Sequence, residues 1–93
     1  MIMKLILCTA CHDVFKCNIG EVRSCKCGKA TGRYLNKIDA EYAGETAVPI
    51  GFGNTTLSQA IQNQPERGMG MEFEAFVIPK ECDTFIKKDS LHS

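Results

Sequence analysis

Two closely spaced pairs of cysteines near the start of the sequence have the residue type and spacing of a metal site. Cys8 and Cys11 are separated by two residues, Cys25 and Cys27 by one, and thirteen residues lie between the pairs. A short turn brings two thiolates to one point about 2.3 Å from a zinc ion, and a second pair completes a tetrahedron. Gly28 follows Cys27 and can adopt the positive φ that such turns commonly require. The spacing predicts one structural Zn²⁺ ion held by Cys8, Cys11, Cys25 and Cys27.

Other ligands and other chemistries compete with this prediction. Cys17 can replace Cys25, although a buried apolar role for Cys17 is favoured. His12 directly follows Cys11, and the neighbour of a ligating cysteine usually points away from the ion, which favours an exposed position. Iron also suits tetrahedral sulfur ligation. Disulfides and a redox pair are less favoured, because the chain shows neither an export signal nor a βαβ setting.

The same residues resemble a known family. Leu7-Cys8-Thr9-Ala10-Cys11 and Ser24-Cys25-Lys26-Cys27-Gly28-Lys29 are similar to the two knuckles of a zinc ribbon, and the likeness covers residues 5–30. The second knuckle departs from the common pattern by having one residue between its cysteines. The whole chain resembles small zinc-ribbon proteins of bacteria and their phages. The resemblance implies a fold and a metal but no activity.

Length and composition indicate one ordinary globular domain. The chain has 93 residues, of which 44% are hydrophobic and 24% charged, and a metal would help so small a core. No segment has the eighteen or more apolar residues of a membrane span. Only three apolar residues in succession follow Lys4, fewer than a signal peptide requires. We therefore expect a cytoplasmic protein.

Charge is unevenly distributed although the formal net charge is zero. Residues 1–40 carry seven basic and three acidic side chains, whereas residues 41–79 carry one basic and five acidic ones. The neutral total argues against a purely electrostatic nucleic-acid binder. The basic side chains that could face a partner on the ribbon are Lys16, Arg23, Lys26, Lys29 and Arg33.

The middle of the chain predicts a sheet and one helix. Alternation over residues 33–42 indicates one half-buried strand, followed by a turn at 43–45 and a second strand over 47–50. Pro49 suggests that this second strand lies at an edge or ends there. Thr56 and Gln59 have the spacing of a capping box, which starts a helix that Pro65 ends after residue 63 or 64.

The glycine-containing loop before this helix offers an alternative site. Free amides and the helix dipole favour an anion at a helix N-terminus, so a small anionic ligand such as a nucleotide could bind there. Arg33 or Arg67 could neutralise it. The loop lacks the lysine of a P-loop, and a turn capped by its own threonines is favoured. The residues of this alternative are Gly53, Asn54, Thr55 and Thr56.

The C-terminal third predicts one more strand and a tail. Residues 71–78 alternate between an apolar face and a mixed one, which indicates a strand that is central at its end or pairs with another chain. Cys82, Phe85 and Ile86 have helical spacing. We expect an α+β fold in which a single domain over 1–79 comprises a ribbon (5–30) and a sheet with a short helix (31–79), followed by a tail over 80–93.

The function that these patterns favour is binding without catalysis. Four cysteines leave zinc no open position for water, and no nucleophile has an evident base. We expect a zinc-ribbon module that contacts nucleic acid or an acidic protein surface, such as a phage-type regulator or inhibitor. The alternatives are a small-anion binder and a protein-assembly module that forms a homo-oligomer through strand 71–78.

Overall fold

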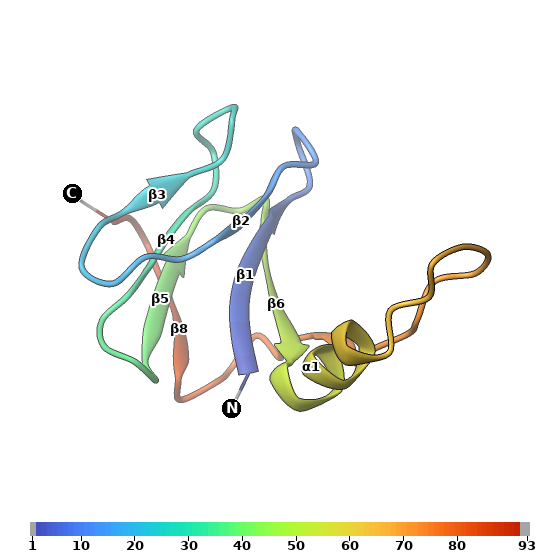
Figure 1. The fold of residues 1–93 in the computed structure, drawn as a ribbon. Helices are drawn as coiled ribbons and strands as arrows, with labels where there is room; N and C mark the ends of the chain where they lie inside the picture. Colours follow the sequence, from blue (N-terminus) through green and yellow to red (C-terminus); the bar gives the residue numbers. More distant parts are fainter. Residues whose placement is uncertain (1, 92–93) are drawn as a thin grey trace.

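The computed structural model describes residues 2–91, and their strands form two four-stranded sheets (Figure 1). The first sheet has the order β2-β1-β6-β7 and the second has the order β3-β4-β5-β8. The elements of the first sheet are β1 (Ile2–Cys8), β2 (Val14–Lys16), β6 (Ala47–Gly53) and β7 (Ala75–Val77). Those of the second are β3 (Arg23–Ser24), β4 (Thr31–Tyr34), β5 (Ala40–Ala43) and β8 (Phe85–Lys88). One helix in this range, α1 (Asn54–Gln62), extends from the end of β6.

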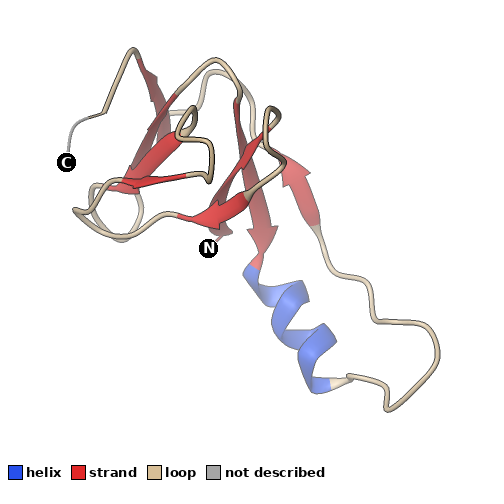
Figure 2. Ribbon diagram, turned by 90° about the horizontal axis from the view of Figure 1, so that it is seen from above, coloured by secondary structure: helices blue, strands red, loops and turns tan. Residues whose placement is uncertain are grey.

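The expected α+β class is wrong, because strands make up 38% of the chain and helix only 10%. The single short helix lies outside the two sheets and contributes only Ala60 to the buried residues (Figure 2). Sheet packing against sheet therefore provides the core, as in other mostly β architectures.

The core lies between the two sheets and is built from alternate residues of the strands. In β1, Lys4, Ile6 and Cys8 are buried and share one face. A Cβ on Gly32 of β4 would clash with Ile6 Cδ1, so the β1 face points at β4 and glycine permits the close approach. The edge-to-face pair of Tyr42 and Phe85, with ring centroids 5.0 Å apart, fills the other side of the core.

Three expected strands differ from the structure. The run 33–42 is interrupted between β4 and β5, because the Asn36 side-chain oxygen accepts hydrogen bonds from the main chains of Ile38 and Asp39 and forms a turn. Strand 71–78 is shorter than predicted, since only 75–77 form β7, and β7 is an edge strand rather than a central one.

The third correction concerns β6, which was expected to lie at an edge or to end near Pro49. It continues to Gly53 and pairs with both β1 and β7. Ile78 donates its main-chain N–H to Pro49 O at 2.9 Å, so both main-chain groups of Pro49 face β7. The last β7 pair is Ile50 with Val77, and the missing Pro49 donor therefore falls just beyond the paired region.

Two expectations about helices need correction, the cap of α1 and a helix near Cys82. α1 begins at Asn54, its N-cap is Gly53, and no side chain caps it, so the predicted capping box of Thr56 and Gln59 is wrong. The C-terminal end agrees with the prediction, since Asn63 is the C-cap. The helix expected around Cys82 and Phe85 is instead β8, which pairs in parallel with β5.

The segment 80–93 that was predicted as a tail contributes to the core. Phe85 is fully buried, while Ile86 beside it is 44% exposed. Residues 1, 92 and 93 of the predicted domain and tail lie outside the described part of the chain.

The burial of Phe85 leads to a stability prediction. Phe85→Ala should lower the free energy of unfolding by about 3–5 kcal/mol, because it removes a buried ring and leaves a cavity. The neighbouring change Ile86→Ala should cost less than about 1 kcal/mol, since that side chain is half exposed. Urea unfolding of both variants at saturating zinc measures the difference, and equal losses would contradict the role of β8 in the core.

Candidate metal centre

Four cysteine sulfurs converge at one end of the two sheets. The Sγ atoms of Cys8, Cys11, Cys25 and Cys27 all lie within 4.8 Å of one another. Cys27 Sγ is 3.6 Å from Cys8 Sγ and 3.5 Å from Cys25 Sγ. Ligands 2.3 Å from a tetrahedral ion are about 3.8 Å apart. The cluster therefore has the size and the donor atoms to hold one metal ion.

Each cysteine pair belongs to a hairpin of a different sheet. Cys8 ends β1 and Cys11 lies in the turn toward β2, whereas Cys25 and Cys27 lie between β3 and β4. Both turns close in the same way. The residue after the second cysteine has positive φ, 62° at His12 and 79° at Gly28. Its N–H donates to the carbonyl of the first cysteine, at 2.7 Å and 3.1 Å respectively.

This geometry explains why the second knuckle can be one residue shorter. The hydrogen bond joins residues four positions apart in the first turn, Cys8 and His12, and three positions apart in the second, Cys25 and Gly28. Either turn presents both of its sulfurs on one side. The positive φ expected for Gly28 is confirmed, while the same conformation at His12 was not anticipated.

Three groups around the sulfurs were missed by the sequence analysis. The Thr46 hydroxyl lies 3.3 Å from Cys8 Sγ, and the Ala30 N–H donates to Cys25 Sγ at 3.4 Å. The Asp13 carboxylate accepts a hydrogen bond from Lys26 N at 3.0 Å and so connects the two knuckles. Thr46 is thirty-eight residues from Cys8, and no local spacing could have indicated the contact. Such outer contacts orient metal ligands and tune their basicity.

The thiols influence one another's protonation. A hydrogen bond from the Thr46 hydroxyl, with others from the main chain, lowers the pKa of Cys8 to about 6. Burial alone would raise the pKa of Cys25, but hydrogen bonds from Ala30 and Cys27 outweigh it and the pKa is lowered. The Lys29 main chain favours the Cys27 thiolate, yet burial and the three neighbouring sulfurs raise its pKa to about 12. Four thiolates at this spacing thus need a bound cation to offset their repulsion.

Neither Cys17 nor His12 belongs to the sulfur cluster. Cys17 is buried in the core, where a Cβ on Gly32 would come within 3.3 Å of its sulfur, and burial raises its pKa to about 11. The alternative ligand set with Cys17 is therefore not supported. His12 is exposed, as predicted for the neighbour of a ligating cysteine.

The five predicted basic contact residues divide into two groups. Arg33 is half buried and its Nε lies 2.7 Å from Glu41 Oε1, so its charge is compensated within the chain. The other four are exposed: Lys16, Arg23, Lys26 and Lys29. Arg23 lies over the Phe15 ring and donates to Lys16 O at 2.9 Å, which fixes it beside β2.

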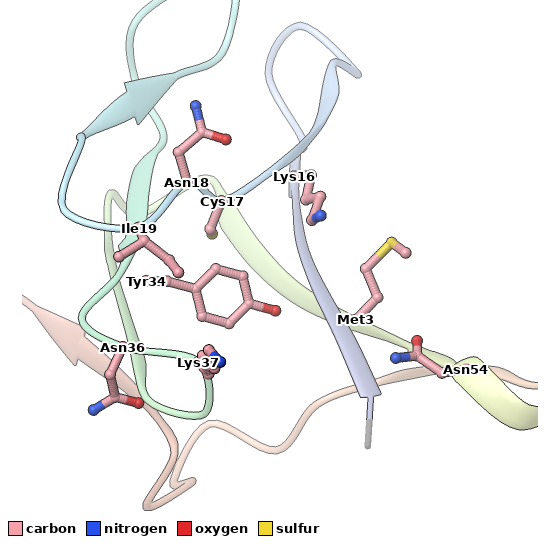
Figure 3. A pocket seen from close by; sticks show the side chains of 9 residues that line it. All are labelled: Met3, Lys16, Cys17, Asn18, Ile19, Tyr34, Asn36, Lys37 and Asn54. Atoms are coloured by element: carbon pink, nitrogen blue, oxygen red, sulfur yellow. The ribbon is translucent and has the colours of Figure 1, made fainter.

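A pocket of about 350 Å³ lies beside Lys16, one of these four exposed cations (Figure 3). In Figure 3, Lys16 and Met3 lie on one side, Ile19 and Asn36 on the other, and the Tyr34 ring lies between them. The lining also includes Asn18, Lys37 and Asn54, and none of the described lining residues is acidic. The pocket therefore combines an apolar floor with amide and ammonium groups, a mixture common in small-molecule sites.

The predicted anion loop at the start of α1 is occupied by the chain itself. Gly53 N donates to Glu74 O at 2.9 Å, and Thr56 Oγ1 accepts from Glu74 N at 2.9 Å. Asn54 Oδ1 is buried without a donor among the described residues, and Thr55 is exposed. A carbonyl acceptor beside an acidic residue disfavours an anion at this position. The threonine-closed turn is the better description of this loop.

No protein-family model, curated protein sequence or solved structure matches the chain. Within residues 2–91, the structure contains no helix that is long and apolar enough to cross a membrane.

The cysteine cluster predicts that substitutions of two buried cysteines, Cys25 and Cys17, affect metal binding differently. Cys25→Ser should abolish stoichiometric metal binding, because three thiolates cannot complete the tetrahedron. Cys17→Ala should retain one metal ion per chain and lose only about 1 kcal/mol of stability through core packing. Native mass spectrometry of both variants checks this, and metal loss in Cys17→Ala with retention in Cys25→Ser would reverse the ligand assignment.

The Thr46 hydroxyl generates a second prediction. Thr46→Val should weaken zinc binding about tenfold or more, as expected when an outer contact to a ligand is removed. Among the hydrogen bonds that lower the pKa of Cys8 to about 6, the one from the Thr46 hydroxyl contributes most, so the variant must displace a proton that the native chain has already lost. The loss of zinc affinity relative to the native chain should therefore grow as the pH falls from 9 toward 6.

Competition with a chelator at several pH values measures this deficit. Thr9→Val is the matched control, because the Thr9 hydroxyl contacts Thr46 O rather than a sulfur. Equal affinities for Thr46→Val and Thr9→Val would contradict a role for the Thr46 hydroxyl.

Proposed function

We propose that the chain is a non-enzymatic zinc-binding module of zinc-ribbon type that contacts single-stranded nucleic acid. The zinc ion would be structural, because four cysteine thiolates fill its coordination sphere and leave no position for water or substrate. Zinc is favoured over iron for a site whose role is to hold two hairpins together without redox change.

The observation that carries the proposal is the position of Lys16. It is exposed on β2, its main chain is bound by Arg23, and its side chain lines the 350 Å³ pocket. Lys16 thus belongs both to the group of four exposed cations and to the lining of a pocket that contains amide side chains. A nucleic-acid backbone could follow the cations while one base enters the pocket.

Two details favour a single strand over a duplex. The four exposed cations are few for the phosphate density of a duplex, and the chain has no net charge. Phe15 and Tyr34 are buried, so this surface offers no platform on which several bases could stack, and the proposed contact is limited to one base in the pocket. A single base in a pocket requires a flexible strand.

The proposal predicts a modest, salt-dependent affinity. Lys16→Ala, Arg23→Ala and Lys26→Ala should each weaken binding of a labelled mixed-sequence single-stranded oligonucleotide about three- to tenfold, and each should reduce the salt slope by about 0.7. Lys88→Ala is the control, since β8 and β3 lie at opposite edges of the second sheet. Fluorescence anisotropy over a range of salt concentrations measures both quantities.

The same titration distinguishes the alternative partner. Equal losses for Lys88→Ala and the three other variants would contradict a defined surface. Absence of oligonucleotide binding together with binding of an acidic peptide would favour an acidic protein partner instead.

A further inference from the structure

The edge strand β7 has a free backbone edge and an exposed apolar surface. β7 pairs with β6 on one side, and no strand in residues 2–91 pairs with its other side. All three of its residues are exposed, with Phe76 at 43% and Val77 at 69%. A flat apolar edge of this kind is normally covered, charged or paired with another chain.

The hydrogen bonds to the first sheet show which backbone groups remain free. Glu74 O accepts from Gly53 N, and Ile78 N donates to Pro49 O. In an extended strand the N–H and C=O of one residue point to the same side, and the side alternates along the chain. The groups of Glu74, Phe76 and Ile78 therefore face β6, and those of Ala75 and Val77 face outward.

We propose that two copies of this chain form a symmetric dimer by antiparallel pairing of β7 with β7, with the twofold axis passing through Phe76. In this register Ala75 lies opposite Val77 of the second copy, and Val77 lies opposite its Ala75. Both residues present outward groups, so the two positions form four hydrogen bonds. Phe76 lies opposite Phe76 of the second copy. This is a non-hydrogen-bonded pair, in which side chains approach most closely.

Charge selects an antiparallel arrangement centred near this residue. Glu72 and Lys80 lie four positions before and after Phe76, so the register places each Glu72 opposite a Lys80 of the other copy. Both side chains are exposed. A parallel arrangement would place each of these charges beside its own kind, which is unfavourable.

The position of Pro79 favours this register over its neighbour. An axis through Val77 would place Ala75 opposite Pro79 and Glu74 opposite Lys80, which also pairs opposite charges. Pro79 has no N–H to donate, so that register leaves the Ala75 carbonyl of β7 without a donor in both copies, whereas the Phe76 register places Pro79 opposite Phe73, outside β7. An axis through Ala75 would leave Lys80 without an acidic partner.

The contact should be weak and concentration-dependent. Three strand residues bury little area, and the adjoining loop adds Met71 and Phe73, which are 49% and 37% exposed. Interfaces of this small class commonly have micromolar dissociation constants. The dimer is independent of the proposed nucleic-acid contact, because β2 and β7 lie at opposite edges of the first sheet.

Charge exchange tests both the dimer and its register. Sedimentation velocity of the zinc-loaded chain at low salt should show a reversible monomer–dimer equilibrium. Glu72→Lys alone and Lys80→Glu alone should each weaken it about tenfold, since two symmetric attractions become two repulsions. The double exchange of both residues should restore it. A native chain that stays monomeric up to near-millimolar concentration overturns the proposal, and so does a double exchange that fails to recover.

A backbone variant provides the second test. Val77→Pro removes two of the four hydrogen bonds and should abolish the dimer, while Val77→Thr keeps the N–H and should preserve it. Retained zinc and an unchanged circular dichroism spectrum show that each variant is folded. A dimer that survives Val77→Pro would place the contact elsewhere and overturn the proposed pairing.

Discussion

The arrangement of the whole chain depends on four sulfurs that join hairpins of two different sheets. The β1–β2 hairpin supplies Cys8 and Cys11, and the β3–β4 hairpin supplies Cys25 and Cys27. The buried side chains between the sheets are few, and so small a core gains much from a metal crosslink. The thiols repel one another once deprotonated, as the high pKa of Cys27 indicates. Formation of the sheet–sheet interface and metal binding should therefore be thermodynamically coupled.

A second contact joins the sheets at the other end of β1. Lys4 is buried, its Nζ donates to Ile38 O, and the Tyr34 ring lies 5.7 Å from it. The Tyr34 hydroxyl in turn accepts the Lys4 main-chain N–H at 2.9 Å. No described acidic side chain pairs with Lys4, so a carbonyl and an aromatic ring must compensate the cost of burying its charge. Because Lys4, Ile6 and Cys8 share one face, a single strand fixes the relation of the two sheets along its length.

The sequence allowed the four clustered cysteines to be predicted but not their surroundings. Ligand spacing is a local property, whereas the contact of Thr46 with Cys8 depends on the pairing of β1 with β6. The same limit explains the errors in the fold. Alternation over 33–42 is real, but the side chain of Asn36 forms a turn that interrupts it. The helical spacing of Cys82, Phe85 and Ile86 yields to parallel pairing with β5, which depends on residues far away in the sequence.

An alternating pattern reveals that a strand has an apolar face without revealing what covers it. The strand 71–78 was expected to be central in a sheet at its end or to pair with another chain, and in the structure Ile78 is buried whereas Phe76 and Val77 are exposed. The chain therefore uses this pattern at an edge, on the opposite side of the first sheet from Lys16. A dimer formed there would leave both basic surfaces free and hold them at a fixed separation. Two weak contacts to one strand would then act together, so the affinity of the pair would exceed that of either copy.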